Sequence, residues 1–389
     1  MIIEREILKD IRPYLDSPEA IIVTGMRRTG KTTLLNSIYG EITSPNKLFL
    51  DLENPLNQKY FGEEDYEKIK FNLEQKGLNF GEKAYVFLDE IQLVKNIPHI
   101  AKYFHDHYSV KFFMSGSSSF YMKNLFSESM AGRKFVFELF PLNFTEFLRM
   151  KGEKLVLPHG AKAISQTTFA TFSGLYEEYI TFGGFPGVVK KTSVQEKKKA
   201  LEDIFSSYFQ LEILQMSDFR KSTVVRDLIL LLMQRAGSKL DIQKLSSELG
   251  VSRPTIYEYI SFLEQTYFIK RIKQFGKGAD IEVRGGEKVY LCDSGLLNNS
   301  ARVSEGALFE NNIFQLLRPH GTLHYYQKGN RGEIDFILNK KEAFEVKLFP
   351  SISEIKNLKK LSANLKLKKC SVISKKYFEH TDVTYGFML

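Results

Sequence analysis

A glycine-containing loop near the start of the chain constrains the fold more than any other feature. The loop follows an apolar run at residues 20–24, opens a helical pattern, and has the sequence Gly25-Met26-Arg27-Arg28-Thr29-Gly30-Lys31-Thr32. In this Walker A pattern, main-chain N–H groups surround phosphates, and the positive end of the helix dipole faces the same phosphates. The segment therefore predicts a nucleoside triphosphate site in an α/β fold.

The loop residues receive separate roles in this interpretation. Lys31 places a charge between the β and γ phosphates, and Thr32 supplies a hydroxyl ligand for Mg²⁺. Two loop arginines are unusual charges there, and we expect one to contact the nucleotide or a domain interface and the other to be solvated. The nucleotide-contacting set is Gly25, Met26, Arg27, Arg28, Thr29, Gly30, Lys31, Thr32 and Thr33.

A second apolar run predicts the strand that carries the acidic groups. Residues 84–88 are uninterrupted apolar side chains, as in a buried parallel strand, and Asp89 and Glu90 follow directly. Ligands gather at the carboxyl ends of such strands. We expect Asp89 to hold Mg²⁺, mostly through water, and Glu90 to polarise the attacking water as a general base.

Two further residues are candidates with open alternatives. Ser117 follows an apolar strand at residues 110–114 and could contact the γ phosphate, although a Ser/Gly segment also forms ordinary turns. Arg133 precedes another strand and could reach the nucleotide of a neighbouring subunit, where a guanidinium offsets charge on the transferred phosphoryl group. The alternative for Arg133 is an intrachain salt bridge.

Several ordered motifs together resemble a known family. They are Gly25-x-Arg27-Arg28-x-Gly30-Lys31-Thr32, Leu88-Asp89-Glu90-Ile91-Gln92, Gly116-Ser117-Ser118, Gly132-Arg133, Pro141-Leu142-x-Phe144-x-Glu146-Phe147 and Gly183-Gly184-Phe185-Pro186. The chain resembles, over nearly its whole length, the prokaryotic AAA-type ATPases that carry a conserved C-terminal domain of unknown function. The resemblance implies an AAA-type parallel sheet, ATP and Mg²⁺ as cofactors, and ATP hydrolysis.

A length of 389 residues favours several domains. We predict an AAA-type P-loop ATPase domain at 1–150, a helical lid and connector at 151–217, a winged helix at 218–292 and a restriction-endonuclease-like α/β domain at 293–389. The break at Gly183-Gly184-Phe185-Pro186 is either a hinge or a plain turn between helices.

The winged helix is predicted from a short helix at 241–250, a tight turn, and a second helix that starts at Arg253-Pro254. Ile256, Ile260, Leu263 and Tyr267 recur at helical spacing and should pack inward. Basic residues of the expected wing, Lys270, Arg271, Lys273 and Lys277, are available for DNA phosphates. Because outward Glu258 and Glu264 would oppose phosphates, a winged helix that contacts protein instead stays equally open.

Charged residues near the C-terminus suggest a second site. Asp335 and Glu345-x-Lys347 lie on strand-like segments about ten residues apart, so alternation places them on one side of a hairpin. Asp335 and Glu345 would coordinate a hard divalent metal such as Mg²⁺ through oxygen. Lys347 would position or deprotonate the water that attacks a phosphodiester. The resemblance to restriction-endonuclease-like domains adds Glu310 as the helix carboxylate. The alternative is a half-exposed hairpin, or a nuclease-like fold without its chemistry.

Composition sets broad limits. A formal charge of +9 fits contact with polyanions and equally fits solubility. Two distant cysteines give no metal or disulfide framework, as in a reducing cytosol. We find neither a signal-peptide profile nor an apolar run of membrane-spanning length, so we expect a cytoplasmic protein without a membrane partner.

These features predict Mg²⁺-dependent ATP hydrolysis by an AAA-type ATPase coupled to a DNA-associated winged-helix and nuclease-like module. The expected partners are ATP, DNA and further copies of the chain. One alternative is an ATP-gated, metal-dependent DNA nuclease. Another is a nucleotide-dependent signalling or assembly switch that does not bind DNA.

Overall fold

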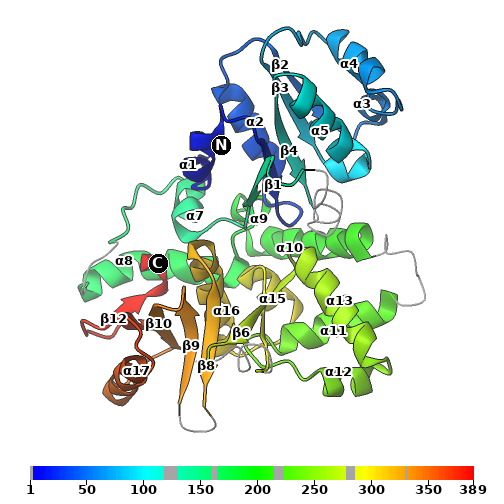
Figure 1. The fold of residues 1–389 in the computed structure, drawn as a ribbon. Helices are drawn as coiled ribbons and strands as arrows, with labels where there is room; N and C mark the ends of the chain where they lie inside the picture. The colour runs from blue at the N-terminus through cyan, green and yellow to red at the C-terminus, as the bar shows by residue number, and fades with distance from the viewer. Residues whose placement is uncertain (1–2, 118–129, 159–163, 214–221, 277–284, 329–331) are drawn as a thin grey trace. The chain divides into compact units, whose positions relative to one another are not determined.

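The computed structural model divides the chain into two compact units. It describes residues 3–117, 130–158, 164–213, 222–276, 285–328 and 332–389. The first unit holds residues 1–140 with 265–267, and the second holds 141–264 with 268–389 (Figure 1). Among the described helices, none combines the length and the apolar character needed to span a bilayer.

The first unit alternates strands and helices. Its strands are β1 (Ala20–Thr24), β2 (Lys47–Asp51), β3 (Ala84–Asp89), β4 (Val110–Gly116) and β5 (Lys134–Glu138). Its helices are α1 (Leu8–Ile11), α2 (Lys31–Glu41), α3 (Pro55–Lys59), α4 (Tyr66–Glu74) and α5 (Ile97–His107), with a 3₁₀ turn, η2 (Ile91–Leu93), directly after β3. The strands predicted around the Walker A loop and before Asp89 are confirmed.

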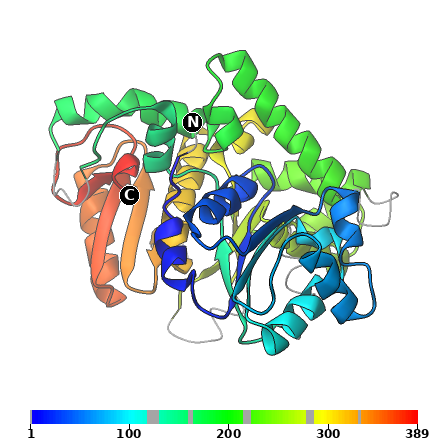
Figure 2. The same ribbon diagram turned by 90° about the horizontal axis from the view of Figure 1, so that it is seen from above.

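All five strands are parallel, in the order β2-β3-β4-β1-β5. Successive residues of each strand point to opposite faces of the sheet and pack into two separate hydrophobic cores. Ile21, Val23 and Phe87 pack with α1 and α2 on one face, while Ile22, Val86 and their neighbours pack with α4 and α5 on the other. Figure 2 shows these two helix layers, in blue and cyan, on either side of the sheet. The sheet is therefore buried on both faces, as its near-continuous apolar strands predict.

The second unit begins with helices and ends with a sheet. Its helices are α7 (Phe144–Lys151), α8 (Gln166–Phe182), α9 (Pro186–Val189), α10 (Val194–Tyr208), α11 (Ser222–Gln234), α12 (Ile242–Leu249), α13 (Arg253–Gln265), α15 (Ser294–Ser300), α16 (Glu305–Leu317) and α17 (Ile352–Asn364). Its strands are β6 (Ile269–Gln274), β7 (Lys288–Leu291), β8 (Leu323–Gln327), β9 (Glu333–Leu338), β10 (Glu342–Lys347), β11 (Lys369–Ser374) and β12 (Val383–Tyr385).

These strands form one mixed seven-stranded sheet, in the order β12-β11-β10-β9-β8-β6-β7. The expected wing, β6 with β7, is an antiparallel pair, but β6 also pairs in parallel with β8. The sheet therefore crosses the boundary drawn at 292/293 from the sequence. The physical reason is that a two-stranded wing has a free edge, and here β8 covers the free edge of β6.

The helix-turn-helix is present as α12 and α13. Ile256, Ile260 and Leu263 are buried as predicted, and Tyr259 and Phe262 are buried with them. Tyr267 lies beyond the end of α13 and is only half-buried, so its predicted place on the inward helical face is wrong.

The Gly183-Gly184-Phe185-Pro186 break forms a buried turn between α8 and α9. The Gly184 N–H donates to the Asp293 carboxylate at 2.8 Å, and the Gly184 carbonyl accepts from the Leu142 N–H at 2.7 Å. Asp293 is fully buried and also caps α15 through the Leu296 N–H at 2.9 Å. These hydrogen bonds fix the turn, which we call the junction, against Leu142 and the start of α15. They favour a plain turn between helices over a hinge.

Replacing Asp293 should weaken this junction. Asp293→Ala removes a helix cap, worth about 1 kcal/mol, and leaves a second buried N–H without its partner, at about 1–3 kcal/mol. We expect the free energy of unfolding of the second unit, measured by urea titration, to fall by about 2–4 kcal/mol. The exposed cap Asp241, which accepts from the Lys244 N–H, is the matched control and should cost about 1 kcal/mol. Equal losses in the two variants would contradict the junction.

Candidate functional site

The Walker A loop joins β1 to α2 in a compact form. Gly30 precedes α2 with φ of 99°, a left-handed conformation that favours glycine. A Cβ on Gly25 would lie 2.2 Å from the Leu139 carbonyl oxygen, so the chain leaves room only for glycine there. The Lys31 ammonium donates to the carbonyl oxygens of Gly25 at 3.0 Å and Met26 at 3.2 Å. The charged group is thus held on the loop itself.

The other loop residues differ in exposure. Thr29 is fully buried, and its hydroxyl donates to the Met26 carbonyl at 2.8 Å. Thr32 and Thr33 are exposed on the first turn of α2. Arg28 has a left-handed φ of 65°, and the Arg27 guanidinium lies 3.9 Å from the Glu53 carboxylate. The loop therefore keeps threonine side chains open to solvent at the start of the helix.

Parallel pairing brings the other predicted groups to the same edge of the sheet. Thr24 of β1 pairs with Gly116 of β4, so Ser117 comes next to the start of the loop. Strand β3 ends at Asp89 beside β4, and both Asp89 and Glu90 are buried. The edge therefore gathers an ammonium, two carboxylates and a hydroxyl.

Two residues that the sequence analysis gave no role connect these groups. The Ser115 hydroxyl donates to the Asp89 carboxylate. The Gln92 amide donates to the Glu90 carboxylate and to the Ser117 hydroxyl, the latter at 3.2 Å. Gln92 stood in the Leu88-Asp89-Glu90-Ile91-Gln92 motif, but only the 3₁₀ turn after β3 folds it back toward Glu90.

Arg133 lies away from this edge. Strand β5 runs parallel to β1 with Lys134 beside Ala20, so Arg133 is near the amino end of β1. At 3.3 Å per strand residue, it lies on the order of 15–20 Å from the Walker A loop of its own chain. Its guanidinium is paired with Asp106 at 2.9 Å. The structure therefore shows the intrachain salt bridge, and contact with another copy stays a prediction.

The basic residues expected in the wing are largely paired. The Arg271 guanidinium contacts Glu264 at 2.7 Å and Glu287 at 2.8 Å, and Lys270 contacts Glu264 at 3.2 Å. Burial opposes the charge of Glu264, but these cations outweigh it and hold the pKa of Glu264 below its usual value. Lys273 is exposed, whereas Lys277, like Ser118, lies outside the described residues. Arg271 is thus held between two carboxylates, whereas Lys270 remains exposed beside Glu264, so their contact with phosphates stays a prediction.

The four C-terminal candidates come close together. Phe336 of β9 pairs with Phe344 of β10, which places Asp335 next to Glu345, and the Lys347 ammonium contacts Glu345 at 2.7 Å. Glu310 projects from α16 and accepts the Tyr290 hydroxyl at 2.6 Å. We call Glu310, Glu333, Asp335 and Glu345 the carboxylate cluster.

A lysine that the sequence analysis did not assign lies inside this cluster. The Lys288 ammonium is 2.8 Å from Glu333, 3.6 Å from Glu310 and 3.9 Å from Asp335. No sequence spacing could indicate it, because β7 reaches the cluster only through the sheet. Within the described residues, no group of three or more His, Cys, Asp or Glu side chains is arranged to hold a metal ion.

Burial sets the protonation of the cluster. It raises the pKa of Glu310 to about 7 and that of Glu345 to about 7, and the neighbouring Asp335 charge adds to both shifts. For Lys288, burial opposes the charge, but Glu310 and Asp335 outweigh it and raise its pKa above the ordinary value. The ammonium therefore stays charged at neutral pH.

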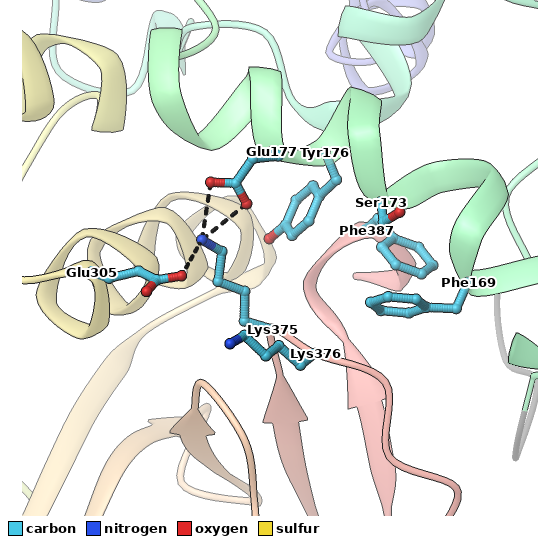
Figure 3. Close-up of a pocket in the computed structure, with 8 residues that line it drawn as sticks. All are labelled: Phe169, Ser173, Tyr176, Glu177, Glu305, Lys375, Lys376 and Phe387. Atoms are coloured by element: carbon cyan, nitrogen blue, oxygen red, sulfur yellow. Dashed lines mark hydrogen bonds and ion pairs between the residues drawn. The ribbon is translucent and has the colours of Figure 1, made fainter.

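A pocket of about 260 Å³ lies elsewhere in the second unit (Figure 3). Rings of Phe169, Tyr176 and Phe387 line one side, and the Lys375 ammonium contacts Glu177 at 2.9 Å and Glu305 at 2.7 Å. Two carboxylates thus neutralise the lysine. These ion pairs connect Lys375, directly after β11, to α8 and α16.

Two family models match separate parts of the chain, one mainly in the first unit and one in the second. Residues 17–148 match the model described as an AAA domain, and residues 173–306 match one described as a domain of unknown function, DUF8612. Residues 17–148, which hold the five strands of the first unit, are therefore similar to an AAA domain. The second match spans α8 to the start of α16.

Two relatives that this chain matches over most of its length are described as uncharacterized proteins. An uncharacterized protein of Haemophilus influenzae is 26% identical over 407 residues, covering 98% of this chain and 96% of that protein. Uncharacterized protein MJ1544 of Methanocaldococcus jannaschii is 27% identical, covering 85% and 74%. The solved structure of Aeropyrum pernix ORC1 in complex with DNA is 12% identical, with a TM-score of 0.37, and covers 80% of this chain and 94% of that one. A TM-score this low carries no argument about function.

The raised pKa values of the cluster predict a pH dependence. Glu345 has a pKa of about 7 when folded, against 4.5 as its ordinary value. The folded state therefore binds the proton more tightly, so this stabilising contribution is complete below pH 4.5 and is lost as the pH rises through 7. Over this window, Glu345→Gln should make the fall in unfolding free energy shallower by up to about 1.4 kcal/mol per pH unit.

Urea titrations at several pH values would measure these slopes. Glu305→Gln is the control, because Lys375 holds the pKa of Glu305 below its usual value and Glu305 does not titrate in this window. Identical slopes for wild type and Glu345→Gln would contradict the assignment.

Proposed function

We propose that the first unit binds ATP with Mg²⁺ and hydrolyses it. The observation that carries this proposal is the convergence of the Lys31 ammonium, the Asp89-Glu90 carboxylates and the Ser117 hydroxyl at one edge of the AAA sheet. The loop and the first turn of α2, Gly25 through Thr33, would contact the phosphates through N–H groups. Ser117 would contact the γ phosphate.

The residues fit the proposed metal. Thr32 offers an exposed hydroxyl, and Asp89 offers a carboxylate already oriented by Ser115, which are the hard oxygen ligands that Mg²⁺ prefers. Charge developing on the transferred phosphoryl group would be neutralised by Mg²⁺ held at these two residues. Lys31 adds a second positive charge on the same side.

Glu90 acts as the general base in this proposal, and Gln92 positions it. A carboxylate that takes a proton from water must be aimed at that water. The Gln92 amide holds the Glu90 carboxylate and also contacts Ser117, so the two groups share one support. A change at the γ phosphate that moves Ser117 would therefore also move Glu90.

Arg133 fits this proposal only through another copy of the chain. Its own Walker A loop lies beyond reach, and releasing it requires the Asp106 pair to open. A neighbouring copy in a homo-oligomer would have to present the amino-terminal edge of its sheet to the nucleotide. We propose this contact as the route by which oligomerisation stimulates hydrolysis.

For the second unit, we propose a nucleotide-dependent switch rather than a DNA-associated module. Two of the basic residues expected on DNA, Lys270 and Arg271, are engaged by Glu264 and Glu287. Phosphate contacts supply most of the non-specific affinity for DNA. Cations that are already paired with carboxylates contribute less to it, which weakens the DNA-associated interpretation. The nuclease alternative meets an internal ammonium, that of Lys288, within 4 Å of the candidate metal ligands Glu310 and Asp335.

Nucleotide-site variants test the ATPase proposal. Glu90→Gln should lower kcat about 100-fold or more while the Kd for ATP stays within about threefold, because only the proton transfer is lost. Gln92→Leu should lower kcat about tenfold, again with little change in Kd. Lys31→Ala should weaken ATP binding as well as turnover.

Phosphate release and calorimetric titration with ATP and Mg²⁺ provide both quantities. Lys95→Ala, an exposed lysine of the same unit, is the control and should behave as wild type. Wild-type turnover by Glu90→Gln would refute the assigned base.

The role of the second unit is tested with DNA. We expect duplex and single-stranded DNA at low salt neither to bind tightly nor to raise ATP turnover, because two of the wing cations, Lys270 and Arg271, are already paired with carboxylates. Fluorescence anisotropy and the same phosphate-release assay measure the two effects. Salt-sensitive binding together with stimulated turnover would restore the DNA-associated function and reject the switch.

A further inference from the structure

The carboxylate cluster contains its own cation. Lys288 projects from β7, and its side chain is only 6% exposed. Its ammonium has three carboxylates within 4 Å, one from α16 and two from β9. It also lies 5.4 Å from the centre of the Tyr325 ring, a favourable cation–π contact.

Several cluster oxygens accept from other internal donors, whereas the second Glu345 oxygen is buried and has no hydrogen-bond partner among the described residues. Asp335 accepts the Val346 N–H at 2.8 Å, Glu310 accepts the Tyr290 hydroxyl, and Glu345 accepts Lys347. A hard divalent ion needs several oxygens at about 2.0–2.6 Å around one point. The Lys288 ammonium instead brings its positive charge among three of the carboxylates, 2.8 Å from Glu333, 3.6 Å from Glu310 and 3.9 Å from Asp335.

We propose that the Lys288 ammonium takes the place of a divalent ion in the carboxylate cluster, which holds this nuclease-like centre closed without metal. The proposal goes beyond the ATPase function and is independent of the nucleotide site. It explains why the candidates Glu310, Asp335, Glu345 and Lys347 come together and yet form no metal-binding group. The C-terminal module then acts as a structural or docking element, and no step of phosphodiester cleavage is assigned to it.

The test measures Mn²⁺ binding to the full chain without nucleotide, by calorimetry and by the electron paramagnetic resonance of free Mn²⁺. Asp89→Asn is present throughout, so that the ATPase site does not contribute. Up to about 1 mM Mn²⁺, we expect Mn²⁺ binding to this parent protein to be the same with and without Asp335→Asn, because the cluster binds no Mn²⁺. Lys288→Met should create one Mn²⁺ site that depends on Asp335. Its Kd should lie at least about tenfold below the 1 mM limit set by the parent protein.

Matched variants make the result specific. Lys375→Met removes another buried lysine held by two carboxylates and should gain no site. Lys288→Arg keeps the charge and should stay metal-free. Loss of the new site in Lys288→Met with Asp335→Asn would locate it in the cluster.

Two results would overturn the proposal. One is an Asp335-dependent Mn²⁺ site in the parent protein, a measurement that needs no Lys288 variant and so stands even where Lys288→Met fails to fold. The other is a folded Lys288→Met protein, checked by circular dichroism, that gains no Mn²⁺ site. Neither result bears on ATP turnover, which is measured separately.

Discussion

Parallel pairing of β3, β4 and β1 is the constraint on which the nucleotide site depends. Because neighbouring parallel strands end at the same edge, the Walker A loop, the Asp89-Glu90 pair and Ser117 meet there although more than eighty residues separate the first from the last. Burial of both sheet faces keeps the register, since a slip by one residue would exchange the two cores. The chemistry of the first unit follows from that edge.

Internal charge pairing has the corresponding importance in the second unit. Lys288, Arg271 and Lys375 are each held by two or more carboxylates, in a chain whose net charge of +9 alone suggests affinity for polyanions. A cation that is already paired gains little from a phosphate, because it must first give up its own partner. These three pairs add nothing to the net charge of +9, because each cation is balanced by carboxylates.

Much of the first unit could be predicted from local patterns. The Walker A loop, the strand before Asp89 and the helix after Lys31 are contiguous segments, and their spacing carries the geometry. The second unit was predicted less completely, because β6 pairs with β8 across some fifty residues and so joins two segments that looked like separate domains. Gln92 and Lys288 were missed for a related reason: each acts through a neighbour that only folding supplies.

The amino-acid sequence by itself predicted the nucleoside triphosphate site of the first unit, since that depends on a motif whose residues contact one another along the chain. It also supplied the candidate carboxylates near the C-terminus. Only the tertiary structure decided what those carboxylates surround, where Arg133 stands relative to the loop, and which wing cations are already paired. The reason is physical: which charges pair depends on their distance in space. The spacing of residues in the sequence predicts that distance only within a single helix, strand or turn.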